Sequence, residues 1–166
     1  MTLKINYGIL NVSIEQTEDE TMKNNAIVTM ENFEGFKIES KFSGTKNSML
    51  EQDSVSRHHE VTLTNISTGK NLVFDVWTDT NESLINAEAQ LKDTLYVFLD
   101  ACLVGYTSYE EHCHEVARDI DDESKAIYDK CVEYLQQMEK IYDGDLCDLH
   151  CEVSEQANIW TKMVVL

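Results

Sequence analysis

The stretch HEVTLTNISTGKNLVFDVW, residues 59–77, decides the fold class of the first half of the chain. Polar and apolar residues alternate on both of its arms, and this period of two is typical of half-buried strands. Residues 67–70, Ser-Thr-Gly-Lys, form a turn between the arms. Val61 and Leu63 can therefore face the apolar residues of the second arm across an antiparallel pair. We expect a hairpin with arms 59–66 and 71–77.

Alternation upstream predicts further strands. Apolar and polar residues alternate in residues 3–7 and 10–14, on either side of Gly8. They also alternate in residues 36–42, and residues 27–30 are the expected partner of that strand across a turn at Glu34-Gly35. The sequence thus predicts an antiparallel sheet of four to six strands within residues 2–78. Two polar stretches, 15–25 and 43–57, are typical of exposed loops.

From residue 81 the apolar period becomes helical. The first helix carries its apolar residues on one face, has Asn81 or Ser83 as a cap, and ends at Gly105. Ser108 and Glu111 match a capping box that starts a short second helix. Its inward residues are expected to be Tyr109, Cys113 and Val116. A third helix is expected from Asp121 to a glycine cap at Gly144, with the buried stripe Ile127, Cys131, Tyr134 or Leu135, Met138 and Ile141.

Strands followed by helices predict the α+β class, with an N-terminal antiparallel sheet packed against about three helices. We expect one domain over residues 1–166, with a β-rich half (1–80), a helical half (81–145) and a tail (146–166) that docks through Trp160 and the apolar end 163–166. The expected core consists of Phe36, Phe74, Trp77, Leu91, Leu95, Phe98, Cys131, Leu135 and Met138.

Composition limits the function classes. The 166 residues carry 13 Lys+Arg against 31 Asp+Glu, a net charge of −18, which disfavours direct binding to nucleic acid. No apolar run reaches the ~18 residues of a membrane span. The five cysteines are odd in number and irregularly spaced, and the N-terminus lacks a secretory pattern, so we expect a reducing, cytoplasmic setting. The sequence leaves open whether the protein forms a homodimer.

The densest charge lies in residues 110–123, where seven carboxylates face one guanidinium, Arg118, for a net charge of −6. Carboxylates held on helices can imitate the field of a nucleic-acid backbone and attract a basic groove. The alternative is a solvated helical face that serves solubility. The expected partner-binding residues are Glu110, Glu111, Glu115, Asp119, Asp121, Asp122 and Glu123.

Histidines and cysteines form two local groups, His112-Cys113-His114 and Cys147-x-x-His150-Cys151. Together they offer ligands that Zn²⁺ accepts. Neighbouring helical residues point about 100° apart, however, so the first group cannot converge on one ion. We therefore expect no metal and no cofactor, and we expect the cysteines to be small buried residues, with a structural zinc site as the alternative. The weak metal candidates are His112, His114, Cys147, His150 and Cys151.

Sequence motifs of catalysis are missing. The chain has no glycine-rich phosphate loop, no Gly-x-Ser-x-Gly elbow and no His-Glu-x-x-His pair. Nothing positions a dyad of Cys151 with His58 or His59, and the basic patch of Lys37, Lys41, Lys46 and Arg57 is too sparse for nucleic-acid readout. We expect no enzyme. The rival is a metal-dependent nuclease or modifying enzyme that uses the carboxylates of 119–123 with His112 or His114.

Residues 93–142 carry a resemblance to a known family. A helix ending in Asp100-Ala101 is followed by Tyr109-Glu110-Glu111-His112-Cys113 and then by the turn Asp121-Asp122-Glu123-Ser124. This succession resembles a widespread family of small phage and prophage proteins without assigned activity. The chain departs from the family at residues 117–120, where Phe-Gly-Tyr is usual. The resemblance covers about a third of the chain, and its motifs are caps and packing residues.

The resemblance implies a mobile genetic element as the setting, and therefore the cytoplasm of a bacterial host. Small acidic cytoplasmic proteins in that setting are often anti-CRISPR or anti-restriction proteins, an analogy of class that agrees with the charge. We therefore expect a non-enzymatic inhibitor of host defence. Its expected partner is a nucleic-acid-handling protein, with a CRISPR effector nuclease as the first candidate. A phage structural or assembly factor is the third reading.

Overall fold

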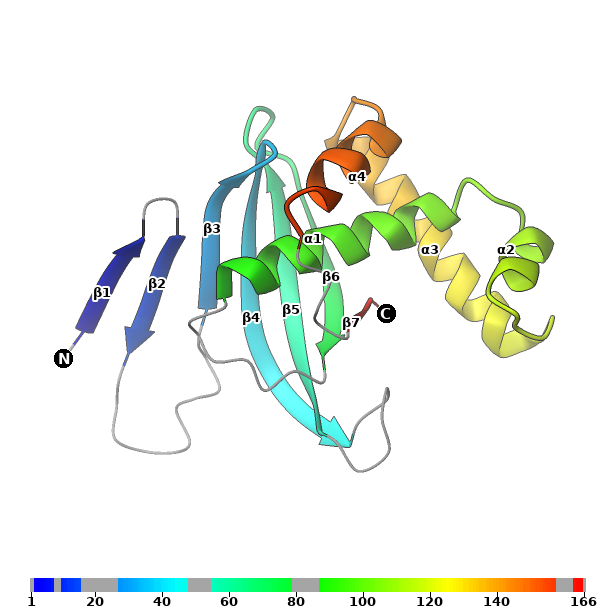
Figure 1. Cartoon of the computed structure of the whole chain (residues 1–166), viewed down its shortest axis with the longest axis horizontal. Coiled ribbons are helices and arrows are strands. Elements are labelled where there is room, and N and C mark those ends of the chain that lie inside the picture. The colour runs from blue at the N-terminus through cyan, green and yellow to red at the C-terminus, as the bar shows by residue number, and fades with distance from the viewer. Residues whose placement is uncertain are drawn as a thin grey trace.

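The computed structural model describes residues 2–7, 10–15, 27–47, 55–78, 87–157 and 163–165, and side chains within 27–44, 57–78, 88–157 and at Val165. Over these residues the chain is an α+β protein, which confirms the predicted class. An antiparallel sheet comes first and helices follow, and the helices gather on one side of the sheet (Figure 1). No described helix is long and apolar enough to cross a membrane.

Within the described residues seven strands pair in the order in which they follow in the chain, and every pair is antiparallel. Six of them lie within residues 2–78, which agrees with the four to six strands predicted there, and residues 163–165 add a seventh beside the strand Asn71–Thr78. The strands are β1 (Thr2–Tyr7), β2 (Leu10–Glu15), β3 (Ile27–Phe33), β4 (Phe36–Asn47), β5 (Val55–Asn65), β6 (Asn71–Thr78) and β7 (Met163–Val165).

The β5–β6 hairpin forms as predicted, with Val61 opposite Phe74 and Leu63 opposite Leu72. The predicted β3–β4 turn is also present. Glu34 and Gly35 both have positive φ, +49° and +82°, which is the backbone of the tight hairpin turn that matches strand twist. Gly35 adopts this backbone without strain, whereas Glu34 does so at a cost.

The loop predicted at 43–57 is wrong over part of its length. β4 continues to Asn47 and β5 already begins at Val55. The polar residues at both ends of this stretch belong to long strands. Apolar and polar residues do not alternate regularly at those strand ends, so the pattern did not indicate strands there. Residues 48–54, most of the stretch 15–25, the caps Asn81 and Ser83, and Trp160 lie outside the described residues.

Four helices follow in the described part of the chain, and the three that lie between residues 81 and 145 are the number expected there. The four helices are α1 (Ala87–Val104), α2 (Tyr109–Glu115), α3 (Asp122–Ile141) and α4 (Leu146–Ser154). The fourth helix occupies part of the expected tail, and Asp145 caps it by accepting hydrogen bonds from the backbone N–H of Cys147 (2.7 Å) and Asp148 (3.3 Å). The prediction that Gly144 caps α3 was wrong, because α3 already ends at Ile141. A Cβ at Gly144 would meet the Tyr142 ring at 2.5–2.9 Å, so glycine leaves room for that ring.

One core lies between the sheet and the helices. Seven of the nine predicted core residues are buried there, and Phe74 of β6 stacks on Phe98 of α1 with ring centroids 4.0 Å apart. Trp77 and Cys131 are only half-buried, so their assignment to the core was wrong. Trp77 alternates with the buried residues Phe74, Val76 and Thr78 of β6, so its side chain lies on the other face of the sheet.

Candidate protein-binding surface

Helix α2 begins with the predicted capping box. The backbone N–H of Glu111 donates to Ser108 Oγ (3.3 Å), and the backbone N–H of Ser108 donates to Glu111 Oε2 (3.0 Å). Hydrogen bonds from the backbone and hydroxyl of Ser108 lower the pKa of the Glu111 carboxyl. Glu111 is therefore one of the predicted partner-binding acids, but it also holds the start of its own helix.

Helix α3 begins with Asp121 as its N-cap, again as predicted. The backbone N–H of Ser124 donates to Asp121 Oδ1 (2.8 Å), and this bond is the main cause of a lowered pKa at the Asp121 carboxyl. Asp121 also stabilises the positive end of the helix dipole. The seven predicted acids thus divide into two capping residues and five others, namely Glu110, Glu115, Asp119, Asp122 and Glu123.

The residues between these two helices are tied down by hydrogen bonds. The backbone N–H of Arg118 donates to the carbonyl of Cys113 (3.0 Å), and the Tyr109 hydroxyl donates to the carbonyl of Asp121 (2.8 Å). Ala117 adopts a left-handed backbone with φ +52°. We call residues 110–123 the α2–α3 corner. It lies at the end of the molecule opposite β1 and projects beyond the sheet (Figure 1).

All seven acids of the α2–α3 corner are exposed. Among the ion pairs that the described residues form, none involves any of these seven carboxylates. The nearest lysine in sequence, Lys125, pairs with Asp129 and lies over the rings of Tyr109 and Tyr128. The charge of −6 over these 14 residues is therefore left for solvent or a partner.

Two apolar side chains lie among these acids. Val116 is 46% exposed and Ile120 is 68% exposed. The prediction that Val116 faces inward was wrong, because α2 ends at Glu115 and the helical period no longer applies to residue 116. The residues that α2 buries are His112 and Cys113. Sequence reasoning identified the acids but missed these two exposed apolar residues.

The histidines and cysteines do not converge. His112 and Cys113 are buried under α2, with the His112 ring against Tyr128, while His114 points to solvent. On α4, Cys147 and Cys151 are exposed, and His150 stacks on Tyr96 with its Nε2 3.5 Å from Asp100 Oδ1. Within the described ranges, no group of three His, Cys, Asp or Glu side chains could hold a metal ion.

A polar cluster that the sequence did not indicate lies on the sheet face opposite the helices. His58 Nε2 lies 2.8 Å from Asp75 Oδ1, and Ser43 Oγ lies within hydrogen-bond distance of His58 Nδ1. The Trp77 ring stacks on His58 with centroids 4.5 Å apart. A register shift of the β4–β5 pair between Phe42 and Gly44 places Ser43 beside His58. These residues come from three strands, so no local motif marks them.

The predicted basic patch is divided. Lys37 pairs with Glu39 (3.1 Å), whereas Arg57 lies over the Phe42 ring, 5.1 Å from its centroid. Lys41 is exposed, and the Lys46 side chain is outside the described residues. The described cations therefore give no continuous track for a phosphate backbone.

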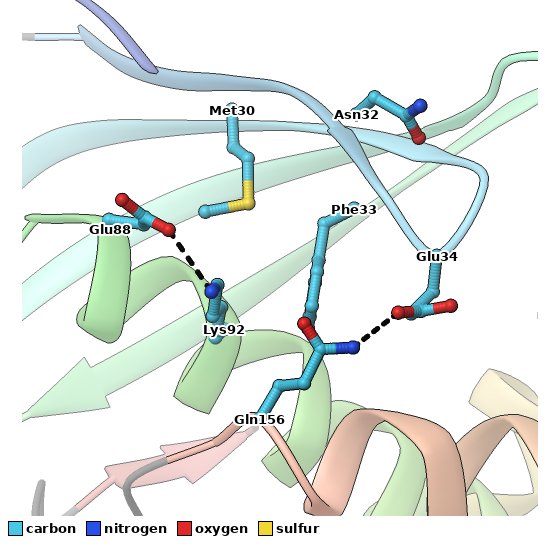
Figure 2. A pocket seen from close by; sticks show the side chains of 7 residues that line it. All are labelled: Met30, Asn32, Phe33, Glu34, Glu88, Lys92 and Gln156. Carbon is cyan, nitrogen blue, oxygen red and sulfur yellow. Dashed lines mark hydrogen bonds and ion pairs between the residues drawn. The ribbon is translucent and has the colours of Figure 1, made fainter. Parts of the chain in front are cut away.

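A shallow pocket of about 240 Å³ lies between the β3–β4 turn, α1 and the residues after α4 (Figure 2). Met30 and Phe33 line its apolar side. Lys92 pairs with Glu88 (3.0 Å) and lies over the Phe33 ring, and Gln156 donates to Glu34. These polar side chains thus contact one another, and the hydrogen bond from Gln156 to Glu34 joins the residues after α4 to the β3–β4 turn.

Comparisons with protein families, curated proteins and solved structures found no match to this chain. The protein is therefore classified by its architecture, an antiparallel sheet covered on one side by helices.

Proposed function

We propose that this protein is a non-enzymatic inhibitor of host defence, encoded by a phage or prophage, that binds a nucleic-acid-handling protein through the α2–α3 corner. A CRISPR effector nuclease is the first candidate partner. The observation that carries the proposal is the set of seven exposed carboxylates, held on a hydrogen-bonded corner without ion pairs among the described residues. The setting in a mobile element rests on the sequence resemblance alone.

Charge explains how such a surface would act. A cationic channel attracts the α2–α3 corner over a Debye length of ~8–10 Å and more in dilute salt, which raises the association rate. The acids come from two helices and the turn between them, so their spacing does not follow one helix face. The corner therefore offers the charge density of a nucleic-acid backbone rather than its regular spacing. Occupying the channel would exclude the guide RNA or the target DNA.

The test uses a variant in which Glu110→Gln, Glu115→Gln, Asp119→Asn and Asp122→Asn are combined, so that both capping acids remain. Against a panel of purified CRISPR effector nucleases, wild type is expected to bind one member with an affinity that falls steeply with salt and to compete with nucleic acid. The variant is expected to bind about 10-fold to 100-fold more weakly, a loss of about 1.4–2.7 kcal/mol. Binding is measured by titration calorimetry at several salt concentrations.

A matched control carries the same change of charge elsewhere, at the exposed residues Glu60, Asp143, Glu152 and Glu155. It is expected to bind nearly as wild type does. Equal loss in both variants would mean that only total charge matters, and no loss in either would reject the α2–α3 corner as the binding surface. Co-purification with virions would instead favour the assembly factor, and stoichiometric bound metal would favour the metal-dependent enzyme.

The Ser43–His58–Asp75 cluster favours a second candidate function, ester hydrolysis. A neutral His58 with its proton on Nε2 can donate to Asp75 and accept from Ser43, which is the order of roles in a catalytic triad. Ser43 Oγ would attack an ester carbonyl while its proton passes to His58 Nδ1, and that proton would then go to the leaving alkoxide. Water, deprotonated by the same ring nitrogen, would then release the acyl group as the carboxylic acid and return the proton to Ser43 Oγ. Two features oppose this function: the Ser43 hydroxyl also reaches the His58 carbonyl (3.4 Å), and the cluster lies on an exposed sheet face.

Labelling with a fluorescent alkyl fluorophosphonate decides on this second candidate. An activated Ser43 would be labelled in wild type and not in Ser43→Ala or His58→Ala, with the adduct mapped by mass spectrometry. We expect no adduct at Ser43, in agreement with the binding function. Stoichiometric labelling at Ser43 would contradict the proposal that the protein is not an enzyme.

A further inference from the structure

We infer that Val116 and Ile120 are the apolar anchors of the α2–α3 corner, and that its partner presents a cationic segment with an apolar side chain between its Lys and Arg residues. This inference rests on the proposed binding function and names the kind of surface that the corner fits. Apolar contacts of this kind act at short range and add to the long-range attraction of the charges.

Exposure of these two residues is the first argument. Ile120 is the most exposed large hydrophobic residue among the described side chains, at 68%, and Val116 is at 46% only four positions earlier. An aliphatic side chain left in water gains when a partner covers it. Single exposed apolar residues need no explanation, but two within one five-residue segment can be covered by the same partner.

Pre-organisation is the second argument. The backbone hydrogen bond from Arg118 to Cys113 and that from Ala117 to His114 close the turn directly after Val116. The Tyr109 hydroxyl bonds to the carbonyl of Asp121, directly after Ile120. Both anchors are thus presented by a backbone that is already held in place. A partner that binds them has little backbone freedom to remove, which favours affinity.

Charge complementarity selects the occupant. Acids flank the two anchors, with Glu115 before Val116, Asp119 before Ile120 and Asp121 after it. An apolar centre with a polar rim is the usual anatomy of a protein interface. A rim of this sign repels anionic lipid, nucleic acid and a second copy of the same corner. The occupant that fits is therefore a protein segment with cationic residues around an apolar side chain.

The experiment uses two synthetic peptides of equal length and equal positive charge. One is a Lys/Arg-rich amphipathic peptide with Leu and Trp on one helical face, and in the other Ser replaces every Leu and Trp. Wild type is expected to bind the amphipathic peptide at least 10-fold more tightly, as measured by fluorescence anisotropy. In the Val116→Ser/Ile120→Ser variant this preference is expected to fall to less than 3-fold, while the salt dependence of binding stays.

The matched control is Ile66→Ser/Val73→Ser, which removes two apolar residues of similar exposure, 48% and 50%, away from the α2–α3 corner. It is expected to keep the full preference, and thermal melts serve to check that all variants are folded. Equal binding of the two peptides, absence of binding, or an unchanged preference in the Val116→Ser/Ile120→Ser variant would overturn the inference.

The two proposals fail in different ways. If neutralising the acids abolishes binding to an effector nuclease and replacing the anchors leaves it unchanged, the proposed function stands and the inference is wrong. If no effector binds but the peptide preference depends on Val116 and Ile120, the corner is a docking site for a basic amphipathic segment and the partner class was wrong.

Discussion

Replacing Phe98 with alanine is expected to lower the free energy of unfolding by about 4 kcal/mol, the usual cost of deleting a large buried aromatic side chain. Phe98 is fully buried on α1. Its ring stacks on Phe74 of β6 and meets the edge of Tyr134 of α3, with centroids 4.0 Å and 5.3 Å away. One side chain therefore joins the sheet to two helices, and its loss leaves a cavity that three elements line.

Urea unfolding followed by circular dichroism measures this effect. Phe98→Leu is the graded variant and is expected to cost about 1–2 kcal/mol, which keeps the comparison measurable if Phe98→Ala does not fold. Val73→Ala is the matched control, because Val73 lies on β6 beside Phe74 but is half exposed on the other face. A loss below about 1 kcal/mol for Phe98→Ala would contradict the packing described here.

Local patterns in the sequence predicted much of this fold because the physics behind them is local. Alternation within a strand indicated the β3–β4 and β5–β6 hairpins, and the spacing of Ser108 and Glu111 indicated the start of α2. Caps depend on residues three positions apart, so they are visible without the tertiary structure. The error at Trp77 was avoidable, since a residue three positions from Phe74 on a strand cannot share its face.

The candidate site was predictable only in part. A run of acids is visible in any sequence, and their exposure follows from the cost of burying charge. The exposure of Val116 and Ile120 depends on where α2 ends and on how the turn to α3 closes, which hydrogen bonds such as Arg118 to Cys113 decide. The contact of Ser43 with His58 depends on a register shift between strands, and periodicity alone does not encode register shifts.

Acid is expected to destabilise the protein through His59. Burial, with smaller contributions from the positive charges of Arg57 and His58, lowers the pKa of His59 from 6.5 to about 4. The His59 ring lies against Phe42, and its Nδ1 is 3.3 Å from Ser40 Oγ. In the unfolded chain His59 therefore binds a proton near pH 6.5, whereas in the folded chain it binds one only near pH 4. The stability from the neutral ring is complete above pH 6.5 and is lost as the pH falls towards 4, by about 3 kcal/mol in all.

The measurement is the free energy of unfolding at intervals from pH 7.5 to 4.5, where His59 is expected to contribute a slope of about 1.4 kcal/mol per pH unit around pH 5. The caps Glu111 and Asp121 have lowered pKa values, so the stability that they provide is lost mainly at lower pH. His59→Gln is expected to flatten the slope, whatever its effect on stability at pH 7.5. His114→Gln is the control, because His114 is exposed on α2 and its replacement should leave the slope unchanged. A slope equal in wild type and His59→Gln would show that this histidine can accept a proton in the folded protein, which burial of its ring should prevent.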